Sequence, residues 1–500
     1  MTPKTTRKTP TQMPTAKIFV NGRWIQARSR ATQEIREPAT LKFLGMAVDA
    51  DATDVDSAVL AAKKAQKTWA KVPGVEKASL LHEISRRIRV MEHELFSLLC
   101  RESGKPLWEA KDCIEWVTSC FDYYAEIGRS NRGRSLPPVA AHQVNFTIKE
   151  PYGVVAAIAP FNFPLLLMAW KVAPALAAGN TLVCKPPHQD PLSNLMMAKA
   201  FEVLPPGVVN MVTGGSATGK ALVNHPDVDM IAFTGSTETG RRIAESAGRD
   251  LKKVNLELGG IDPFIVCEDA PLDIAAPGVA WARMLNAGQV CTSAKRIYVV
   301  DAVADRFIEK VTRFVRTLKL GDPTDASVDV GPLISAEALV KLESQVLRLT
   351  REQGTRVLTG GKRAHPDGLK GHFYEPTVLT GVRHGAVATT EEIFGPIITI
   401  IRVNNVDEAI SLADDSRYGL GACIYTKSLE YAMRAMENIK AGTFWVNDPL
   451  TDNDAGPFGG MRASGIGREL GEEGLDAYRE PNHVHIDYVM ERKGYWFPYS

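Results

Sequence analysis

The chain has 500 residues, of which 45% are hydrophobic and 23% are charged, and its formal net charge is +1 at pH 7. It is too long for one hydrophobic core, and about 150 residues per domain predicts two to four folding units. A charge so close to zero excludes a global attraction to nucleic acid or anionic membranes, so we expect small-molecule partners, with no nucleic acid and no membrane.

The seven cysteines are scattered and form no C-x-x-C pair, which is untypical of a disulfide framework or a structural zinc site. Free thiols fit a reducing compartment, so we expect a cytoplasmic protein without a metal. Residues 1–17 are rich in Thr, Pro and Lys and lack the apolar region of a secretory signal, which predicts a disordered tail. No apolar run is long enough to span a bilayer.

Helical patterns alternate with short β-branched runs in the first half of the chain. Helices are predicted over 54–69 and 75–102, and a short apolar run over 153–160 is typical of a buried parallel strand. The pattern then predicts helix 171–178, strand 181–184, helix 190–204, strand 208–212, helix 217–224 and strand 230–233. This βαβαβ order favours a doubly wound parallel sheet.

A second α/β set follows Gly260. It contains predicted strands 262–266, 296–300, 396–403, 422–425 and 443–446, and a predicted helix 301–318. Segments 129–148 and 483–489 have alternating polarity without a helical period. Two isolated strand-like segments in a helix-rich chain favour pairing between subunits, the alternative being a plain surface hairpin.

Cys291 lies in the sequence NAGQVCTSAKR, where Gly288 lets the backbone approach closely. A thiol just before a helix or strand can have its pKa lowered by backbone N–H dipoles, which would make it a nucleophile. Taken alone, a single cysteine is more often a small buried hydrophobic residue.

Two further motifs contain polar side chains that suit acyl chemistry. Glu257 stands in LELGG between two leucines, where an apolar wall would raise its pKa and make it a general base; a salt-bridged structural glutamate is the alternative. Asn162 stands in PFNFP after a predicted strand, where its amide could donate to an oxyanion; a capping Asx turn is the alternative.

The sequence FTGSTETG, residues 233–240, leads from a strand into a helix, as phosphate sites do. It lacks the three-glycine dinucleotide fingerprint, so the pattern by itself is weak. Lys185 ends the preceding predicted strand in CKPP, from where it could reach a ribose hydroxyl or a phosphate.

Taken together, these motifs resemble the aldehyde dehydrogenase superfamily, in its hydrolytic, NAD(P)-dependent branch. The resemblance rests on order and spacing and covers about residues 18–488. The ordered motifs are PFNFP, CKPP, FTGSTETG, LELGG, GQVCTSAKR, EEIFGP with Glu392 and Phe394, and PFGG at residues 457–460.

The resemblance implies an α/β fold with a variant Rossmann cofactor domain, an α/β catalytic domain and a small β oligomerisation arm that makes homodimers or homotetramers. The expected layout is a tail at 1–17, the NAD(P)-binding domain at 18–131 and 152–257, the catalytic domain at 258–447, the arm at 132–151 and 478–491, a return to the cofactor domain and tunnel mouth at 448–477, and an aromatic tail at 492–500.

The resemblance also implies the roles of four catalytic residues. The Cys291 thiolate attacks the aldehyde, Asn162 and the Cys291 N–H hold the oxyanion, and hydride passes to the cofactor, leaving a thioester. Glu257 then activates the water that hydrolyses the thioester. Glu469, in GREL, resembles a residue that orders the catalytic water or the proton path.

NAD or NADP is the implied cofactor, with NAD slightly favoured. His188 stands where NAD-preferring members usually have a glutamate that repels a 2′-phosphate, and an imidazole does not repel phosphate. The expected cofactor-binding residues are Ile158, Ala159, Pro160, Phe161, Lys185, His188, Gly215, Gly219, Phe233, Thr234, Gly235, Ser236, Thr239, Leu258, Gly259, Glu392 and Phe394.

The matching of motifs also indicates a substrate tunnel. Its expected residues are Asp112, Trp116, Phe163, Leu167, Trp170, Leu285, Val290, Thr292, Asp452 and Phe458. Carboxylates beside aromatic faces suit a cationic substrate, such as betaine aldehyde or an aminoaldehyde. The alternative is that the aspartates cap turns and the substrate is an aliphatic or aromatic aldehyde.

Three other functions fit the sequence less well. A CoA-acylating relative is disfavoured because that branch generally lacks a base like Glu257, and a non-catalytic member is disfavoured by the retention of Cys291 and Asn162. A cysteine hydrolase would need a histidine beside Cys291, and none is near it in sequence. The C-terminal residues 492–500 carry four aromatic side chains, which we expect to dock across a subunit interface.

Overall fold

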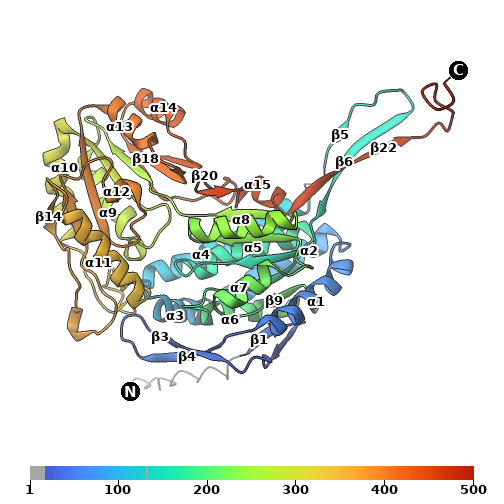
Figure 1. Ribbon diagram of the computed structural model, residues 1–500, viewed down its shortest axis with the longest axis horizontal. Helices are drawn as coiled ribbons and strands as arrows, with labels where there is room; N and C mark the ends of the chain where they lie inside the picture. The colour runs from blue at the N-terminus through green and yellow to red at the C-terminus, as the bar shows by residue number, and fades with distance from the viewer. Residues whose placement is uncertain (1–16, 131–132, 500) are drawn as a thin grey trace, which may run out of the picture.

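The computed structural model describes residues 17–130 and 133–499. The tail predicted for residues 1–17 lies, except for Lys17, outside the described residues. Figure 1 shows two α/β units side by side and a narrow β arm that projects from the body. The α/β fold class is confirmed, and two large sheets provide it.

The first sheet has the order β2-β1-β9-β8-β7-β10-β11-β21. Its strands from β9 to β11 run parallel; β7, β8, β9 and β10 are buried throughout, whereas β11 is exposed at its start and buried at its end. Strand β21 comes from far along the chain and pairs antiparallel with β11. The bounds are β1 Ile18–Val20, β2 Arg23–Ile25, β7 Val154–Ile158, β8 Thr181–Lys185, β9 Val209–Met211, β10 Met230–Thr234, β11 Lys253–Glu257 and β21 Gly465–Ile466.

The helices of this unit differ from the sequence prediction in several places. Helix α4 (Leu107–Gly128) was not predicted, and α5 (Pro164–Ala178) begins before the predicted start at residue 171. The helix predicted over 75–102 is two helices, because Met91 leaves helical geometry (φ −98°, ψ 11°) and both ends α2 and precedes α3. The helix predicted over 190–204 is α6 followed by a 3₁₀ helix, Ala198–Val203. The helices are α1 Ala52–Trp69, α2 Gly74–Val90, α3 Glu92–Ser103, α4 Leu107–Gly128, α5 Pro164–Ala178, α6 Leu192–Met197, α7 Ser216–Val223, α8 Thr237–Arg249 and α15 Gly471–Asp476.

The second sheet has the order β14-β15-β16-β13-β12-β18-β19, and only β14 is antiparallel to its neighbour. A separate apolar core surrounds it. The strands are β12 Pro263–Val266, β13 Arg296–Val300, β14 Arg356–Thr359, β15 Thr377–Thr380, β16 Ile397–Val403, β18 Gly421–Tyr425 and β19 Thr443–Val446. The helices are α9 Leu272–Met284, α10 Asp301–Val315, α11 Ala336–Thr350, α12 Val387–Thr390, α13 Val406–Asp414 and α14 Leu429–Asn438.

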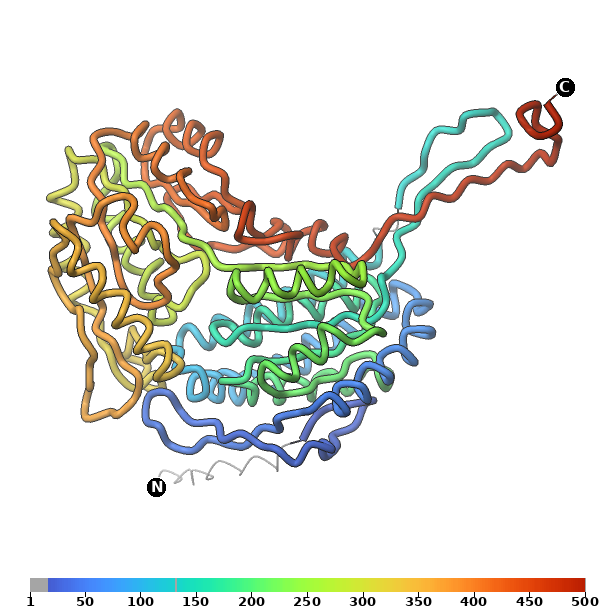
Figure 2. Tube along the Cα trace, viewed as in Figure 1, coloured from blue at the N-terminus to red at the C-terminus, as the bar shows by residue number. Residues whose placement is uncertain are grey.

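The arm is a three-stranded antiparallel sheet in the order β22-β6-β5. Strand β6 (Gln143–Pro151) pairs along its whole length with β22 (Arg479–Asp487), and β5 is Ser135–Leu136. The arm extends away from both large sheets, and the C-terminal segment lies at its far end (Figure 2). Its use in pairing between subunits stays a prediction. Two short ladders complete the fold: β3 Thr32–Arg36 with β4 Phe43–Val48, and β17 Tyr418–Gly419 with β20 Met461–Arg462.

Candidate active site

Two cavities meet at Cys291. The tryptophan cavity, of ≈ 420 Å³, contains Trp108, Trp116, Trp170 and Trp281 in its wall. The glycine cavity, of ≈ 250 Å³, contains Gly235 and Gly259. Cys291 lines both, so a group in either cavity can reach the thiol.

A strained turn precedes Cys291 in the chain. Asn286 and Ala287 have φ of 51° and 53°, in the left-handed region that non-glycine residues rarely adopt. Side chains from elsewhere hold this turn: the Asn286 N–H donates to Glu109 (2.8 Å), and the Asn286 amide donates to the carbonyl oxygen of Asn162 (2.9 Å). The turn therefore fixes the nucleophile's loop against both the tunnel wall and the PFNFP motif.

The electrostatic setting of Cys291 differs from the sequence prediction. The prediction was a pKa lowered by backbone dipoles, but burial raises the pKa of the Cys291 thiol to about 12. The Lys295 ammonium acts in the opposite direction and lowers it, while Asp262, Glu392 and Asp452 raise it further. The lowered-pKa prediction was wrong in this structure because desolvation outweighs the nearby positive charge.

Asn162 lies where the sequence placed it, between β7 and α5. It is buried and lines the glycine cavity together with Cys291. The two residues therefore line one cavity, which an oxyanion site formed by both would require.

Glu257 ends β11 and is fully buried, but it lines neither of the two cavities. Its Oε2 accepts a hydrogen bond from the Gly460 N–H (3.2 Å), and its Oε1 has no hydrogen-bond partner among the described residues. Burial and the charge of Glu469 raise the pKa of Glu257 well above its usual range, as the LELGG pattern predicted.

Glu469 belongs to a buried chain of polar groups beside Glu257. Its Oε1 accepts from the Lys171 ammonium at 2.5 Å, and the same ammonium donates to Thr234 at 2.6 Å. Burial raises the pKa of Glu469, and Lys171 opposes that shift. Lys171 was not singled out from the sequence, because a lysine within an apolar helical run has no local sign of its partner.

The residues around the glycine cavity suit a dinucleotide. Ser236 caps the N-terminus of α8 and lines the cavity. A Cβ on Gly235 would lie 2.5 Å from the Phe233 ring and one on Gly259 would lie 2.3 Å from Oε2 of Glu392, so Phe233 and Glu392 pack directly on the two glycines. Of the expected cofactor residues, those lining this cavity are Pro160, Phe161, Thr234, Gly235, Ser236, Leu258, Gly259, Glu392 and Phe394. The others lie outside its wall: Ile158, Ala159, Lys185, His188, Gly215, Gly219, Phe233 and Thr239.

Several of those outer residues form a second group at the end of β8. A Cβ on Gly219 would lie 3.6 Å from Lys185, and one on Gly215 would lie 3.7 Å from His188. Burial lowers the pKa of Lys185 to about 8, and burial followed by the charge of Lys185 lowers the pKa of His188. Asp49, which the sequence reading missed, accepts from the Gly215 N–H (3.0 Å) and places a carboxylate in this group.

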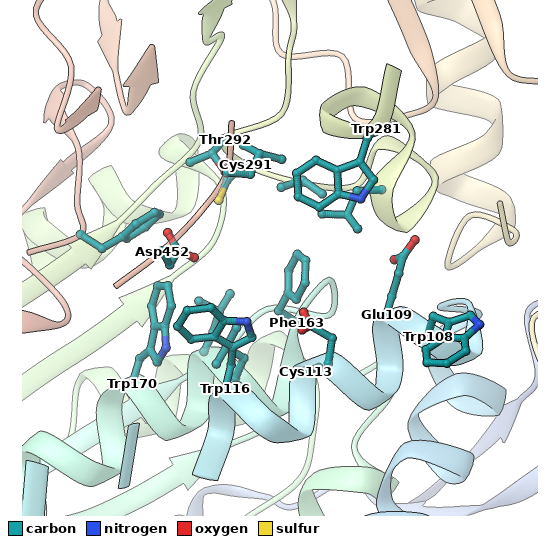
Figure 3. A pocket seen from close by; sticks show the side chains of 17 residues that line it. Trp108, Glu109, Cys113, Trp116, Phe163, Trp170, Trp281, Cys291, Thr292 and Asp452 are labelled. Carbon is teal, nitrogen blue, oxygen red and sulfur yellow. The ribbon is translucent and has the colours of Figure 1, made fainter. Parts of the chain in front are cut away.

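The tryptophan cavity includes every residue expected in the substrate tunnel: Asp112, Trp116, Phe163, Leu167, Trp170, Leu285, Val290, Thr292, Asp452 and Phe458. It also contains residues that the motif comparison missed, notably Trp108, Glu109 and Trp281. In the view of Figure 3, Glu109 lies between Trp108 and Trp281 at one side, and Asp452 lies near Trp116 and Trp170 at the other.

Three carboxyl groups face this cavity, and burial raises the pKa of each. The pKa is about 7 for Glu109 and about 7 for Asp452, and that of Asp112 is also raised. No lysine or arginine is among the lining residues in the described part of the chain. The cavity therefore combines aromatic and aliphatic side chains with carboxyl groups and thiols.

Two kinds of site are not found in residues 17–130 and 133–499. No group of His, Cys, Asp and Glu there is arranged to hold a metal ion. No helix in the same ranges is both long enough and apolar enough to cross a membrane.

Comparison with known proteins gives the family. Residues 24–484 match the Aldehyde dehydrogenase family. The chain is 39% identical to succinate-semialdehyde dehydrogenase [NADP(+)] GabD of Escherichia coli over 471 residues, 94% of this chain and 97% of that protein. It is 37% identical to the peroxisomal aminoaldehyde dehydrogenase 2 of Malus domestica over 498 residues, 97% of this chain and 98% of that protein.

A solved structure agrees with these relatives. Betaine aldehyde dehydrogenase from Staphylococcus aureus, in complex with NAD+, superposes with a TM-score of 0.94 at 32% identity, covering 96% of this chain and 97% of that one. The match covers nearly the full length of both chains. The chain belongs to the aldehyde dehydrogenase family and is an NAD(P)-dependent aldehyde oxidoreductase.

Proposed function

We propose that this protein oxidises a cationic aldehyde, such as betaine aldehyde or an aminoaldehyde, to its carboxylic acid. The observation that supports the proposal is the tryptophan cavity. It reaches Cys291, and its wall contains four tryptophans and three carboxyl groups. A cation gains from both aromatic faces and carboxylates. An anionic aldehyde would meet the same carboxylates without a lysine or arginine among the described lining residues to balance its charge.

In the proposed mechanism, the Cys291 thiolate adds to the aldehyde carbon and forms a thiohemiacetal. The Asn162 amide and the Cys291 N–H donate to the oxyanion, and one such donor is worth about 3 kcal/mol. When bound, the nicotinamide ring supplies a hydride acceptor. Loss of hydride from the thiohemiacetal leaves a thioester on Cys291. Glu257 then takes a proton from water, whose oxygen attacks the thioester, so that the C–S bond breaks and the acid leaves.

Glu257 acts in this scheme only after it turns away from Gly460. Its unpartnered Oε1 and its raised pKa suit a group that accepts a proton and passes it on. The neighbouring Glu469 and Lys171 give that proton a buried polar route, because they lie in contact with each other beside Glu257.

Relatives support a cationic substrate without being uniform. Two of the similar proteins are named for aminoaldehyde and betaine aldehyde, and the Escherichia coli relative is named for succinate semialdehyde. The charge of the tryptophan cavity favours the first two. The alternative is a general aliphatic or aromatic aldehyde, whereas Glu257 disfavours release of the acyl group to CoA.

NAD is our proposed cofactor. The Asp49 carboxylate, within the group formed by Lys185 and His188, would repel the 2′-phosphate of NADP, and the lowered pKa of His188 leaves its imidazole uncharged near neutral pH. We also propose a cofactor domain built on the first sheet, a catalytic domain built on the second, a homodimeric or homotetrameric assembly through the arm, and a cytoplasmic location.

A matched substrate pair tests the proposed charge preference. Betaine aldehyde and 3,3-dimethylbutanal have nearly the same shape, but only the first carries a positive charge. We expect kcat/KM to favour betaine aldehyde at least about tenfold. We expect its KM to fall as the pH rises from 6 to 8, because Glu109 and Asp452, whose pKa is about 7 in each case, ionise over that range. The KM for 3,3-dimethylbutanal should not change.

Variants identify the groups responsible. Asp452→Asn and Asp112→Asn should each raise the KM for betaine aldehyde several-fold while leaving that for 3,3-dimethylbutanal nearly unchanged, since one carboxylate in a partly desolvated site contributes about 1–2 kcal/mol. Equal kcat/KM for the two aldehydes in the unmodified enzyme would refute the cationic assignment and leave the aliphatic alternative.

A further inference from the structure

Lys295 connects the two halves of the site, although no motif singled it out. It lies in the loop that leads from Cys291 to β13, and its side chain is only 1% exposed. The ammonium donates to the backbone carbonyl of Cys291, and it lies 3.1 Å from Oε1 of Glu392. Glu392 lines the glycine cavity together with Cys291.

The backbone of Lys295 is anchored on both sides. Its N–H donates to the carbonyl oxygen of Asp262 (3.2 Å), and its carbonyl accepts from the Thr399 hydroxyl (2.6 Å). Asp262 precedes β12, and Thr399 lies in β16. These are the two strands that flank β13, so the sheet holds the backbone of Lys295 from both sides of β13. The second sheet therefore fixes the backbone of Lys295.

Glu392 is equally constrained. Its Oε1 accepts from the Gly260 N–H at 3.4 Å, and a Cβ on Gly259 would lie 2.3 Å from its Oε2. The carboxylate thus lies on the glycine pair with one oxygen beside Lys295. Without Lys295, a carboxylate in this place would lose its ion pair.

We propose that Lys295 is a positioning residue for the oxidation, holding the backbone of Cys291 and the carboxylate of Glu392 in one fixed arrangement. The proposal rests on the proposed function in one respect, because it takes the glycine cavity as the place where the nicotinamide half of the cofactor binds. It assigns Lys295 no contact with the aldehyde.

The charges around the thiol predict in which direction each substitution should change the reactivity of Cys291. The groups that act on Cys291 are Lys295, which lowers its pKa, and Asp262, Glu392 and Asp452, which raise it. Removing the ammonium leaves the carboxylates unopposed and should make the thiol less reactive. Removing the Glu392 charge should make it more reactive.

The rate of alkylation of Cys291 by iodoacetamide, measured from pH 7 to 10 on the full-length, cofactor-free protein, tests this. We expect Lys295→Met to react about tenfold more slowly, which corresponds to one unit of thiol pKa. Lys295→Arg should restore most of the rate, and Glu392→Gln should react several-fold faster than the unmodified protein. Lys310→Met, which removes a lysine of α10 paired with Asp273, should leave the profile unchanged.

A second measurement separates positioning from charge alone. Titration with NAD+ should show that Glu392→Gln weakens binding clearly in the unmodified background but much less in the Lys295→Met background, because the pair acts as a unit. Additive losses would overturn the link between the two residues. So would a Lys295→Met alkylation profile equal to that of Lys310→Met, or a Lys295→Arg profile as slow as that of Lys295→Met.

If Lys295→Met does not fold, Glu392→Gln alone decides the matter, because an unchanged alkylation rate contradicts the proposal. Alkylation needs no aldehyde. A failure of the proposed substrate would therefore leave this result intact, and the two failures are distinguishable.

Discussion

One ammonium and several carboxyl groups act on the pKa of the Cys291 thiol, but burial has a larger effect on that pKa than any of these charges. Its raised pKa means that the thiol is largely protonated in the cofactor-free protein near neutral pH. Reactivity must then depend on how the neighbouring charges are placed when both cavities are filled. Substitution of a single charged side chain near this thiol should therefore change its reactivity strongly, even where the side chain makes few direct contacts with it.

Glu257 provides a residue-scale prediction. Glu257→Gln should still give a burst of NAD(P)H on addition of aldehyde, because the oxidation step does not use the carboxylate. Steady-state turnover should fall about 10²–10⁴-fold, since the base for deacylation is missing. Stopped-flow absorbance measures both phases, and intact mass spectrometry should detect the acyl group on Cys291.

The control for this variant is Glu238→Gln, which changes an exposed glutamate of α8 that pairs with Arg242. It should behave like the unmodified enzyme in both phases. Loss of the burst together with turnover in Glu257→Gln would show that Glu257 acts before the thioester forms, contrary to the proposed mechanism.

At the scale of a structural element, the turn 286–288 before Cys291 determines where the thiol lies. Asn286 and Ala287 both have positive φ, and Gly288 follows with φ of 74°. This conformation costs free energy and persists because Glu109, Asn162 and Gln289 hold the turn. The strained segment places Cys291 where the two cavities meet.

Gly288→Ala should therefore be strongly destabilising. A Cβ at this position would lie 2.1 Å from the Gly395 carbonyl oxygen, in addition to the strain of a positive φ. We expect the free energy of unfolding to fall by at least about 2 kcal/mol, and activity to fall with it. Chemical denaturation measures the first quantity and aldehyde turnover the second.

Gly248→Ala is the matched control. Gly248 lies near the end of α8, and nothing lies within 4 Å of the position that its Cβ would occupy. The change should stabilise the protein slightly, by about 0.5–1 kcal/mol, because alanine favours the helix. A loss of stability for Gly288→Ala no greater than that of an ordinary surface variant would contradict the steric argument.

At the scale of the whole molecule, the arm and the C-terminal segment stand apart from the two packed cores. Tyr495 is 73% exposed, Phe497 78% and Tyr499 72%, and within the described chain their ring contacts are with each other or with Trp496. So much apolar surface at the end of a projecting arm is typical of a surface that is covered in an assembly. The covering surface we propose is a second copy of this chain.

Truncation after Met490 tests this proposal. Burying one aromatic side chain contributes about 1.5–3 kcal/mol, so removing several should weaken the assembly markedly. Sedimentation velocity over a range of protein concentrations should show a smaller species, or dissociation at a higher concentration than for the full chain. Identical sedimentation at every concentration would refute the docking of this segment.

The sequence by itself determined the α/β class and most of the buried strands, and it provided Cys291 as the candidate nucleophile. Apolar runs such as 153–160 are local signals, because a strand buried on both faces needs continuous apolar residues. Motif order was sufficient for Cys291, Asn162 and Glu257 as candidates, and motif matching placed all the expected tunnel residues in one wall. Local patterns failed where a break such as Met91 depends on how two helices pack.

Only the tertiary structure decided the electrostatics and the connections of the site. The pKa of Cys291 depends on burial, which is a property of the packed core, so backbone dipoles near the thiol predicted the wrong direction. Glu109 contacts Asn286 across 177 positions of sequence, and Lys295 reaches Glu392 from a different, distant part of the chain. Contacts of this kind have no local pattern, because they exist only once two sheets have packed and brought distant loops to one cavity.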